Sequence, residues 1–84
     1  MSHHIVHILN HGSRLYKERG MLVCRCDSDD EAHELPIDDI RAVVIAARGV
    51  TVSQELLAAL LEVNAVILHC DHSYRPVGVT SAID

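Results

Sequence analysis

Residues that bind soft metals are frequent in this short sequence. Seven histidines and three cysteines occur among 84 residues. Cys24, Cys26 and Cys70, with the histidines near them, carry the sulfur and imidazole donors that zinc prefers. Structural zinc sites usually use two cysteines separated by two residues, whereas one residue separates Cys24 from Cys26. A stand-alone zinc-binding or redox protein therefore remains an alternative interpretation, and we assign no metal ligand.

Other reactive side chains are close in sequence without forming a recognisable catalytic motif. Cys70, Asp71 and His72 are the residue types of a nucleophile, an acid and a base, but the side chains of neighbouring residues diverge along an extended chain. The carboxylates at 29–31 and 38–39 could chelate magnesium, although solvated turns commonly have this composition. We predict no catalytic residue.

One segment has the composition of a nucleic-acid contact. Arg14, Tyr16 and Lys17 combine positive charges, which bind phosphates, with an aromatic ring, on which a base can stack. The whole chain carries a net charge of −5, which argues against non-specific coating of DNA by this chain alone. Any DNA contact is therefore expected to be local, weak or made only within a larger complex.

The length and composition predict one small domain, residues 1–84, with an aliphatic core. Half of the residues are hydrophobic (49%), yet Phe and Trp are absent and only two Tyr occur. The longest apolar run, 42–47, is far shorter than the roughly 18 residues that a membrane-spanning helix needs. Because three is an odd number of cysteines and no export signal is visible, we expect free thiols and a cytoplasmic location.

Alternating apolar residues and turn signals predict a mainly β (α+β) fold, a small two-sheet sandwich of about seven short strands. Gly20 predicts a tight hairpin turn, and Pro36 predicts a break before a helical corner. The leucines at 56, 57, 60 and 61 predict one helix near 53–63, with Thr51 or Ser53 as its N-cap and Asn64 as its terminator. The predicted strands are 4–9, 14–19, 21–26, 31–35, 41–46, 65–69 and 76–80.

Two of these strands contain more apolar surface than one small sheet face can hide. A second copy of the chain could cover the excess across a two-fold axis. We therefore predict a homodimer with an interface at Val43, Val44, Ile45, Val66, Ile67 and Leu68.

Five segments follow one another in a recognisable order: IVHI at 5–8, RLYKERGMLV at 14–23, ELPIDDIRAVVI at 34–45, VTVSQELLAALLEVNAVILHCD at 50–71 and RPVG at 75–78. In this order they resemble the N-terminal domain of the CRISPR adaptation integrases, especially the branch found beside single-protein effectors. The resemblance implies a small β-rich domain with one helix that dimerises and docks on the small adaptation partner protein. In the whole family, metal-dependent (Mg or Mn) cutting and joining of DNA inserts spacers for antiviral defence.

The resemblance assigns assembly and not catalysis to this chain. The metal ligands of the family lie in a helical domain that follows, so no catalytic residue or cofactor is carried over to these residues. The family's loop between its first two strands approaches the end of bound DNA, and His11, near Arg14, occupies that stretch. We therefore expect a non-catalytic dimerisation and partner-docking domain, truncated or isolated from the rest.

Overall fold

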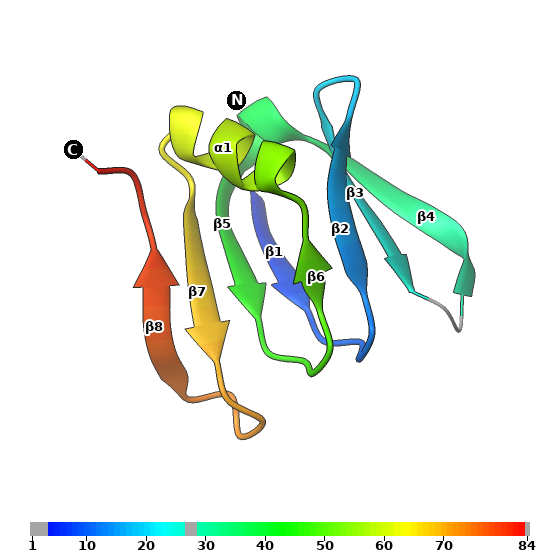
Figure 1. Ribbon diagram of the computed structural model, residues 1–84, viewed down its shortest axis with the longest axis vertical. Helices are drawn as coiled ribbons and strands as arrows, with labels where there is room; N and C mark the ends of the chain where they lie inside the picture. The colour runs from blue at the N-terminus through cyan, green and yellow to red at the C-terminus, as the bar shows by residue number, and fades with distance from the viewer. Residues whose placement is uncertain (1–3, 27–28, 84) are drawn as a thin grey trace.

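The fold is a sandwich of two four-stranded sheets with one α-helix (Figure 1). The computed structural model describes residues 4–26 and 29–83, and the side chains of these residues except 29–31. The elements run in the order β1 (His4–Ile8), β2 (Arg14–Glu18), β3 (Met21–Cys26), β4 (Asp29–Pro36), a 3₁₀ turn η1 (Ile37–Asp39), β5 (Ile40–Ile45), β6 (Thr51–Val52), α1 (Gln54–Glu62), β7 (Val66–Cys70) and β8 (Pro76–Thr80).

The two sheets differ in strand direction. The first, which we call sheet A, has the order β1-β5-β7-β8, and its first three strands are parallel. The second, sheet B, has the order β4-β3-β2-β6 and is antiparallel except for the short β2–β6 pair. In Figure 1 sheet A occupies the left of the view and sheet B the right, with β6 in front of β1, and α1 crosses in front of the upper part of β7 and β5. Residues of both sheets and of α1 contribute to one buried cluster.

The mainly β prediction is confirmed, with eight strands among the described residues where about seven were predicted. The added strand is β6. Thr51 was one of two residues predicted as the helix cap, but its N–H donates to the Ser13 carbonyl (3.0 Å) and it pairs with Arg14 of β2. This pairing is long-range, and short-range sequence signals do not report it.

The helix and the tight turns follow local signals. Ser53 caps α1, because its Oγ accepts a hydrogen bond from the Leu56 N–H (3.2 Å). Asn64 ends the helical segment in the left-handed region (φ 62°) as predicted. Arg19 and Gly20 form a two-residue hairpin turn with φ of 53° and 75°, a geometry that glycine adopts without strain. The predicted helical corner after Pro36 is η1.

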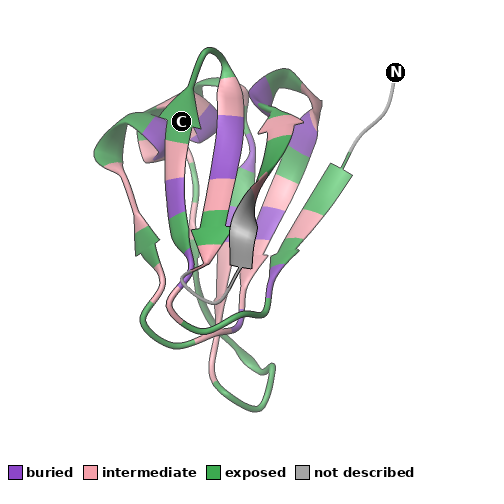
Figure 2. Cartoon of the chain, turned by 90° about the vertical axis from the view of Figure 1, so that its right-hand side faces the viewer, coloured by how far each residue is buried: buried purple, intermediate pink, exposed green. Residues whose placement is uncertain are grey.

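The core lies between sheet A and the layer made by sheet B and α1. Leu56 and Leu60 of the helix are fully buried, and Leu22 and Val23 are both buried although they point to opposite faces of β3. Strand β1, the first from the N-terminus, is exposed along most of its length and buried only at Ile8 (Figure 2). The buried cluster comprises Ile8, Leu15, Leu22, Ile37, Ile40, Val43, Leu56, Leu60, Ala65 and Ile67.

No helix in the described part of the chain combines the length and the apolar composition needed to cross a membrane. The segment between the predicted strands 21–26 and 31–35 includes residues 27 and 28, which lie outside the described residues.

Candidate functional site

The face of sheet A that points away from sheet B is largely apolar. Strand register aligns one row of side chains across this face: His7 pairs with Val44, Val44 with Leu68, and Leu68 with Val79. Its most exposed members on the edge strands are Ile5 (61%), Val77 (69%) and Val79 (60%). We call this surface, made by residues 5, 7, 42, 44, 66, 68, 77 and 79, the outer face. Exposed apolar surface of this continuity marks an interaction site more often than a solvated one.

The structure divides the six residues predicted for the dimer interface between two faces. Val44, Val66 and Leu68 lie on the outer face. Val43 and Ile67 are buried within the chain itself, each 1% exposed, and Ile45 packs against the same core. Successive residues of a strand point to opposite faces, so an unbroken apolar run cannot all face a partner. Exposed Ile5, Val77 and Val79 were not predicted, although alternation along their strands was the signal that could have found them.

A cleft of about 550 Å³ opens at the carboxyl ends of the three parallel strands. Leu9, Ala46 and Cys70, one after each parallel strand, form its floor. The residues just before them, Ile8, Ile45 and His69, face inward. Because successive side chains of a strand alternate between faces, the three floor residues lie on the same side as the outer face. Two loops and a hairpin turn supply its walls, which are made by His11, Ala47, Arg48, Asp71, His72 and Tyr74. The ends of parallel strands commonly carry ligand sites, because the loops converge there.

Two hydrogen bonds fasten the first wall. The Gly12 N–H donates to the Arg48 carbonyl (2.8 Å), and the Arg48 N–H donates to Nδ1 of His11 (2.8 Å). Because Nδ1 accepts, the neutral imidazole carries its proton on Nε2. Ser13, which is buried, anchors the same loop through a 2.6 Å bond from its Oγ to the Asn10 carbonyl. The His11 ring is therefore held in a defined orientation.

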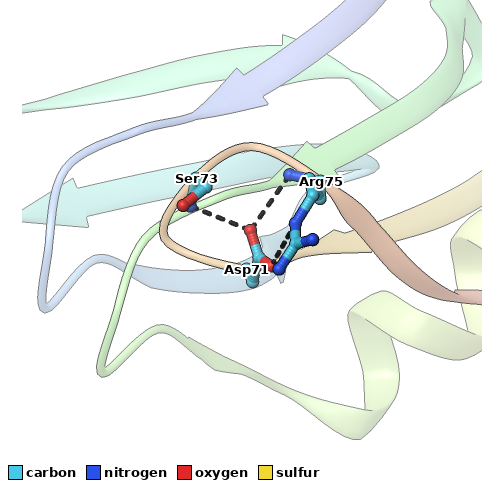
Figure 3. Close-up of polar contacts among 3 residues, drawn as sticks. All are labelled: Asp71, Ser73 and Arg75. Carbon is cyan, nitrogen blue, oxygen red and sulfur yellow. Dashed lines mark hydrogen bonds and ion pairs between the residues drawn. The ribbon is translucent and has the colours of Figure 1, made fainter.

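The second wall is the turn between β7 and β8, which is built on Asp71 (Figure 3). Oδ1 of Asp71 accepts from the N–H groups of Ser73 (2.8 Å) and Arg75 (3.0 Å), and Oδ2 accepts from Nε of Arg75 (3.2 Å). The backbone bonds from Arg75 and Ser73 favour the ionised carboxylate and lower the pKa of Asp71. Tyr74 lies in the left-handed region (φ 64°), and its side chain is exposed. The turn thus fixes the backbone at Tyr74 while its side chain stays exposed.

The residues predicted to contact DNA are not gathered into one patch. His11 lies in the cleft, whereas the register places Arg14 and Tyr16 on the side of sheet B that faces away from sheet A. There the Tyr16 hydroxyl accepts a bond from Nε of Arg25 (3.1 Å), which raises the pKa of Arg25. Lys17 lies instead beside α1, near Ala59. Nothing in the fold tests these four residues, and their DNA contact stays a prediction.

The thiols do not form a metal centre in the described part of the chain. Cys24 and Cys70 are free thiols on different sheets, and they line different clefts. Cys26 donates a 3.5 Å hydrogen bond to the His11 carbonyl. Within residues 4–26 and 29–83, no three His, Cys, Asp or Glu side chains are grouped to hold an ion. The carboxylates considered as magnesium ligands at 29–31 lie outside the described side chains. These residues therefore do not fit a metal-dependent step, and we derive none.

The fold and this cleft define a small β-rich domain, and comparison with known proteins gives its family. A family model described as CRISPR associated protein Cas1 matches residues 6–83. This chain therefore belongs to the Cas1 family, of which it represents the N-terminal β-rich domain. It is 31% identical over 71 residues to the CRISPR-associated endonuclease Cas1 of Neisseria meningitidis serogroup C (strain 8013), a match that covers 84% of this chain and 23% of that protein.

Solved structures share the fold. A partial Cas6-RT-Cas1–Cas2 complex aligns with a TM-score of 0.83 at 16% identity, covering 100% of this chain and 24% of that one. A TtCas1–DNA complex aligns with a TM-score of 0.74 at 9% identity, covering 90% and 28%. The chain thus spans about a quarter of the length of these relatives.

Proposed function

We propose that this chain is a non-catalytic dimerisation and partner-docking domain of a CRISPR adaptation integrase, and that two copies pair through the outer face of sheet A. The observation that carries the proposal is the row from His7 to Val79, to which β5, β7 and β8 contribute apolar side chains, with Ile5 of β1 exposed on the same face. Because Val77 and Val79 lie at the sheet edge and are 69% and 60% exposed, burying them removes apolar area from water at little conformational cost.

Sedimentation equilibrium tests this pairing. Val77→Asp and Val79→Asp each place a charge in the proposed interface, where desolvating it opposes association. We expect the unsubstituted chain to dimerise and both variants to shift toward monomer, with melting temperatures nearly unchanged because these side chains are exposed. Ile83→Asp is the matched control, since Ile83 is fully exposed beyond β8. Dimers that persist in both valine variants would remove the outer face from the proposal.

We also propose that the domain docks on the small adaptation partner protein. The support is the shared fold with Cas1 in a solved assembly that contains Cas2. Co-purification of the chain with the Cas2 protein of its own genome tests it, and retention of Cas2 is the expected result. An untagged chain that elutes separately from Cas2 at micromolar concentrations would contradict docking. The placement beside single-protein effectors stays a prediction that rests on the residues quoted above.

The cleft residue His11 is the proposed contact to a DNA end. One support is the His11 ring, which lines the cleft and is held by the hydrogen bond from the Arg48 N–H. The other is the shared fold with a Cas1 that was solved with DNA. The contacts at Arg14, Tyr16 and Lys17 are proposed more weakly, because these residues lie apart from the cleft. We expect duplex ends to compete for binding more strongly than covalently closed DNA of equal length.

A further inference from the structure

We propose that the cleft binds one unstacked terminal nucleotide of a DNA strand, with Tyr74 as a stacking surface opposite the loop of His11 and Arg48 as the contact for its phosphate. The inference rests on the proposed DNA-end contact of His11 and extends it to two further loops.

The cleft has the size and place of a ligand site. Its volume of about 550 Å³ falls within the range of roughly 300–1,000 Å³ that is usual for small-molecule sites. Its floor of Leu9, Ala46 and Cys70 is apolar or weakly polar, and its walls carry rings and a guanidinium. Apolar side chains next to polar and charged ones suit a planar base that carries a charged phosphate.

Tyr74 has the features of a recognition residue. A non-glycine residue in the left-handed region is uncommon, yet Tyr74 has φ 64° and its side chain is 65% exposed. Core packing therefore does not explain its conformation. The Tyr74 N–H donates to the Asp71 carbonyl (3.0 Å), and the Asp71 N–H donates to the Arg75 carbonyl (2.9 Å). The backbone that carries the ring is therefore fixed, and a tyrosine side chain has only two χ angles, so it loses little conformational entropy when a base stacks on it.

The opposite wall offers a second ring and a positive charge. The Arg48 N–H fixes the His11 imidazole, and the Arg48 side chain, which is exposed, lines the same cleft. Asp71 is the one carboxylate among the residues that line the cleft, and its oxygens accept the three bonds of the turn, one of them from the Arg75 guanidinium. Because the Asp71 carboxylate is paired with Arg75, it repels a phosphate less. The positive charge of Arg48 then remains to attract the phosphate.

A fluorescent base tests the inference directly. A short duplex with 2-aminopurine as an unpaired terminal nucleotide is titrated with the chain, because stacking on an aromatic ring quenches this base. Tyr74→Asn removes the ring while keeping a residue that tolerates the left-handed region, and Tyr74→Phe keeps the ring. Arg48→Gln removes the charge but leaves the N–H that holds His11.

We expect the unsubstituted chain and Tyr74→Phe to quench with affinities within about twofold of each other. Tyr74→Asn should bind about tenfold more weakly and lose the quench, as removal of a stacking ring does. Arg48→Gln should bind more weakly. The slope of log affinity against log salt should become smaller by about 1, the value for one lost phosphate contact. Melting curves of all variants confirm that the turn and the loop are folded.

Three results would overturn the inference. Equal quenching by Tyr74→Asn would show that the ring at Tyr74 does not stack, while leaving the DNA-end contact of His11 standing. Binding of free deoxynucleotide monophosphate but not of the duplex end would give the cleft a different ligand. No binding of either would remove the cleft from DNA recognition, and the dimer proposal would still be decided separately by sedimentation.

Discussion

The backbone N–H of Arg48 donates a 2.8 Å hydrogen bond to Nδ1 of His11, across 37 positions of the sequence. With the bond from Gly12 to the Arg48 carbonyl, it joins the loop after β1 to the loop after β5. These strands are parallel neighbours, so their following loops emerge side by side. Gly49 has a φ of 68°, which a glycine adopts without strain, so the second loop can turn close to the first.

This bond predicts the tautomer of His11. Because Nδ1 accepts, the neutral ring should carry its proton on Nε2. Nitrogen-15 NMR of the imidazole distinguishes the two tautomers, and we expect the Nε2–H form for His11. Replacing His11 with Phe should accelerate amide hydrogen exchange at Arg48, whereas His72→Phe should leave that amide unchanged. A protonated Nδ1 in the neutral ring would show that the two loops are not joined in this way.

Ser13 predicts the stability of the same loop. Its buried hydroxyl donates to the Asn10 carbonyl at 2.6 Å. Ser13→Ala should lower the free energy of unfolding by about 1 kcal/mol, because the partly buried carbonyl loses its donor. Ser73→Ala is the control, since Ser73 uses its backbone N–H toward Asp71 and not its hydroxyl. Equal urea midpoints for the two variants would contradict the anchoring role of Ser13.

Asp71 predicts how the β7–β8 turn responds to acid. Its pKa in the folded chain lies below the ordinary value of 3.8, because it accepts backbone bonds from Arg75 and Ser73. The ionised form therefore stabilises the fold above about pH 4, and this contribution is lost as the pH falls through the lowered pKa. Thermal unfolding of Asp71→Asn should lack this part of the acid destabilisation below about pH 4. Parallel pH profiles for the two proteins would contradict it.

The Cys24 thiol is expected to react slowly with alkylating reagents. Burial is the largest cause that raises its pKa, and a side-chain hydrogen bond between Cys24 and Ser13 opposes the rise in part. Because the thiolate is the reactive form, alkylation of Cys24 should be slow at pH 8 and accelerate only above about pH 9. The raised pKa also means that the fold loses stability as the pH rises beyond the ordinary thiol value. Mass spectrometry after timed iodoacetamide treatment measures it, and fast labelling at pH 8 would contradict the burial of this thiol.

Local signals predicted the parts of the fold that neighbouring residues determine. Ser53 caps α1, Asn64 ends it, and Gly20 turns the β2–β3 hairpin, because each preference acts within a few residues. Strand β6 was missed, since its pairing with Arg14 and Leu15 joins segments far apart in sequence. The predicted dimer interface also did not separate the two faces of β5 and β7. Val43 and Ile67 face the core, while their neighbours Val44 and Leu68 face outward.

The candidate cleft could not be predicted from local sequence signals for a similar reason. The sequence pointed to His11 only through a family resemblance, and it gave no reason to place Arg48 or Tyr74 beside it. The parallel order of β1, β5 and β7 brings their three following segments to one end of sheet A. That order depends on long-range pairing. The left-handed conformation of Tyr74 also has no signal in a residue type that normally avoids it.

The pairing of two copies through the outer face is the central claim, and native mass spectrometry of the untagged chain tests it most directly. One spectrum, recorded over a concentration series without added metal, reports both the number of chains and any bound ion. We predict a metal-free dimer whose share grows with concentration and falls in Val79→Asp. A monomer at every concentration would contradict the claim, and a stoichiometric zinc adduct would restore the metal-binding alternative built on Cys24, Cys26 and Cys70.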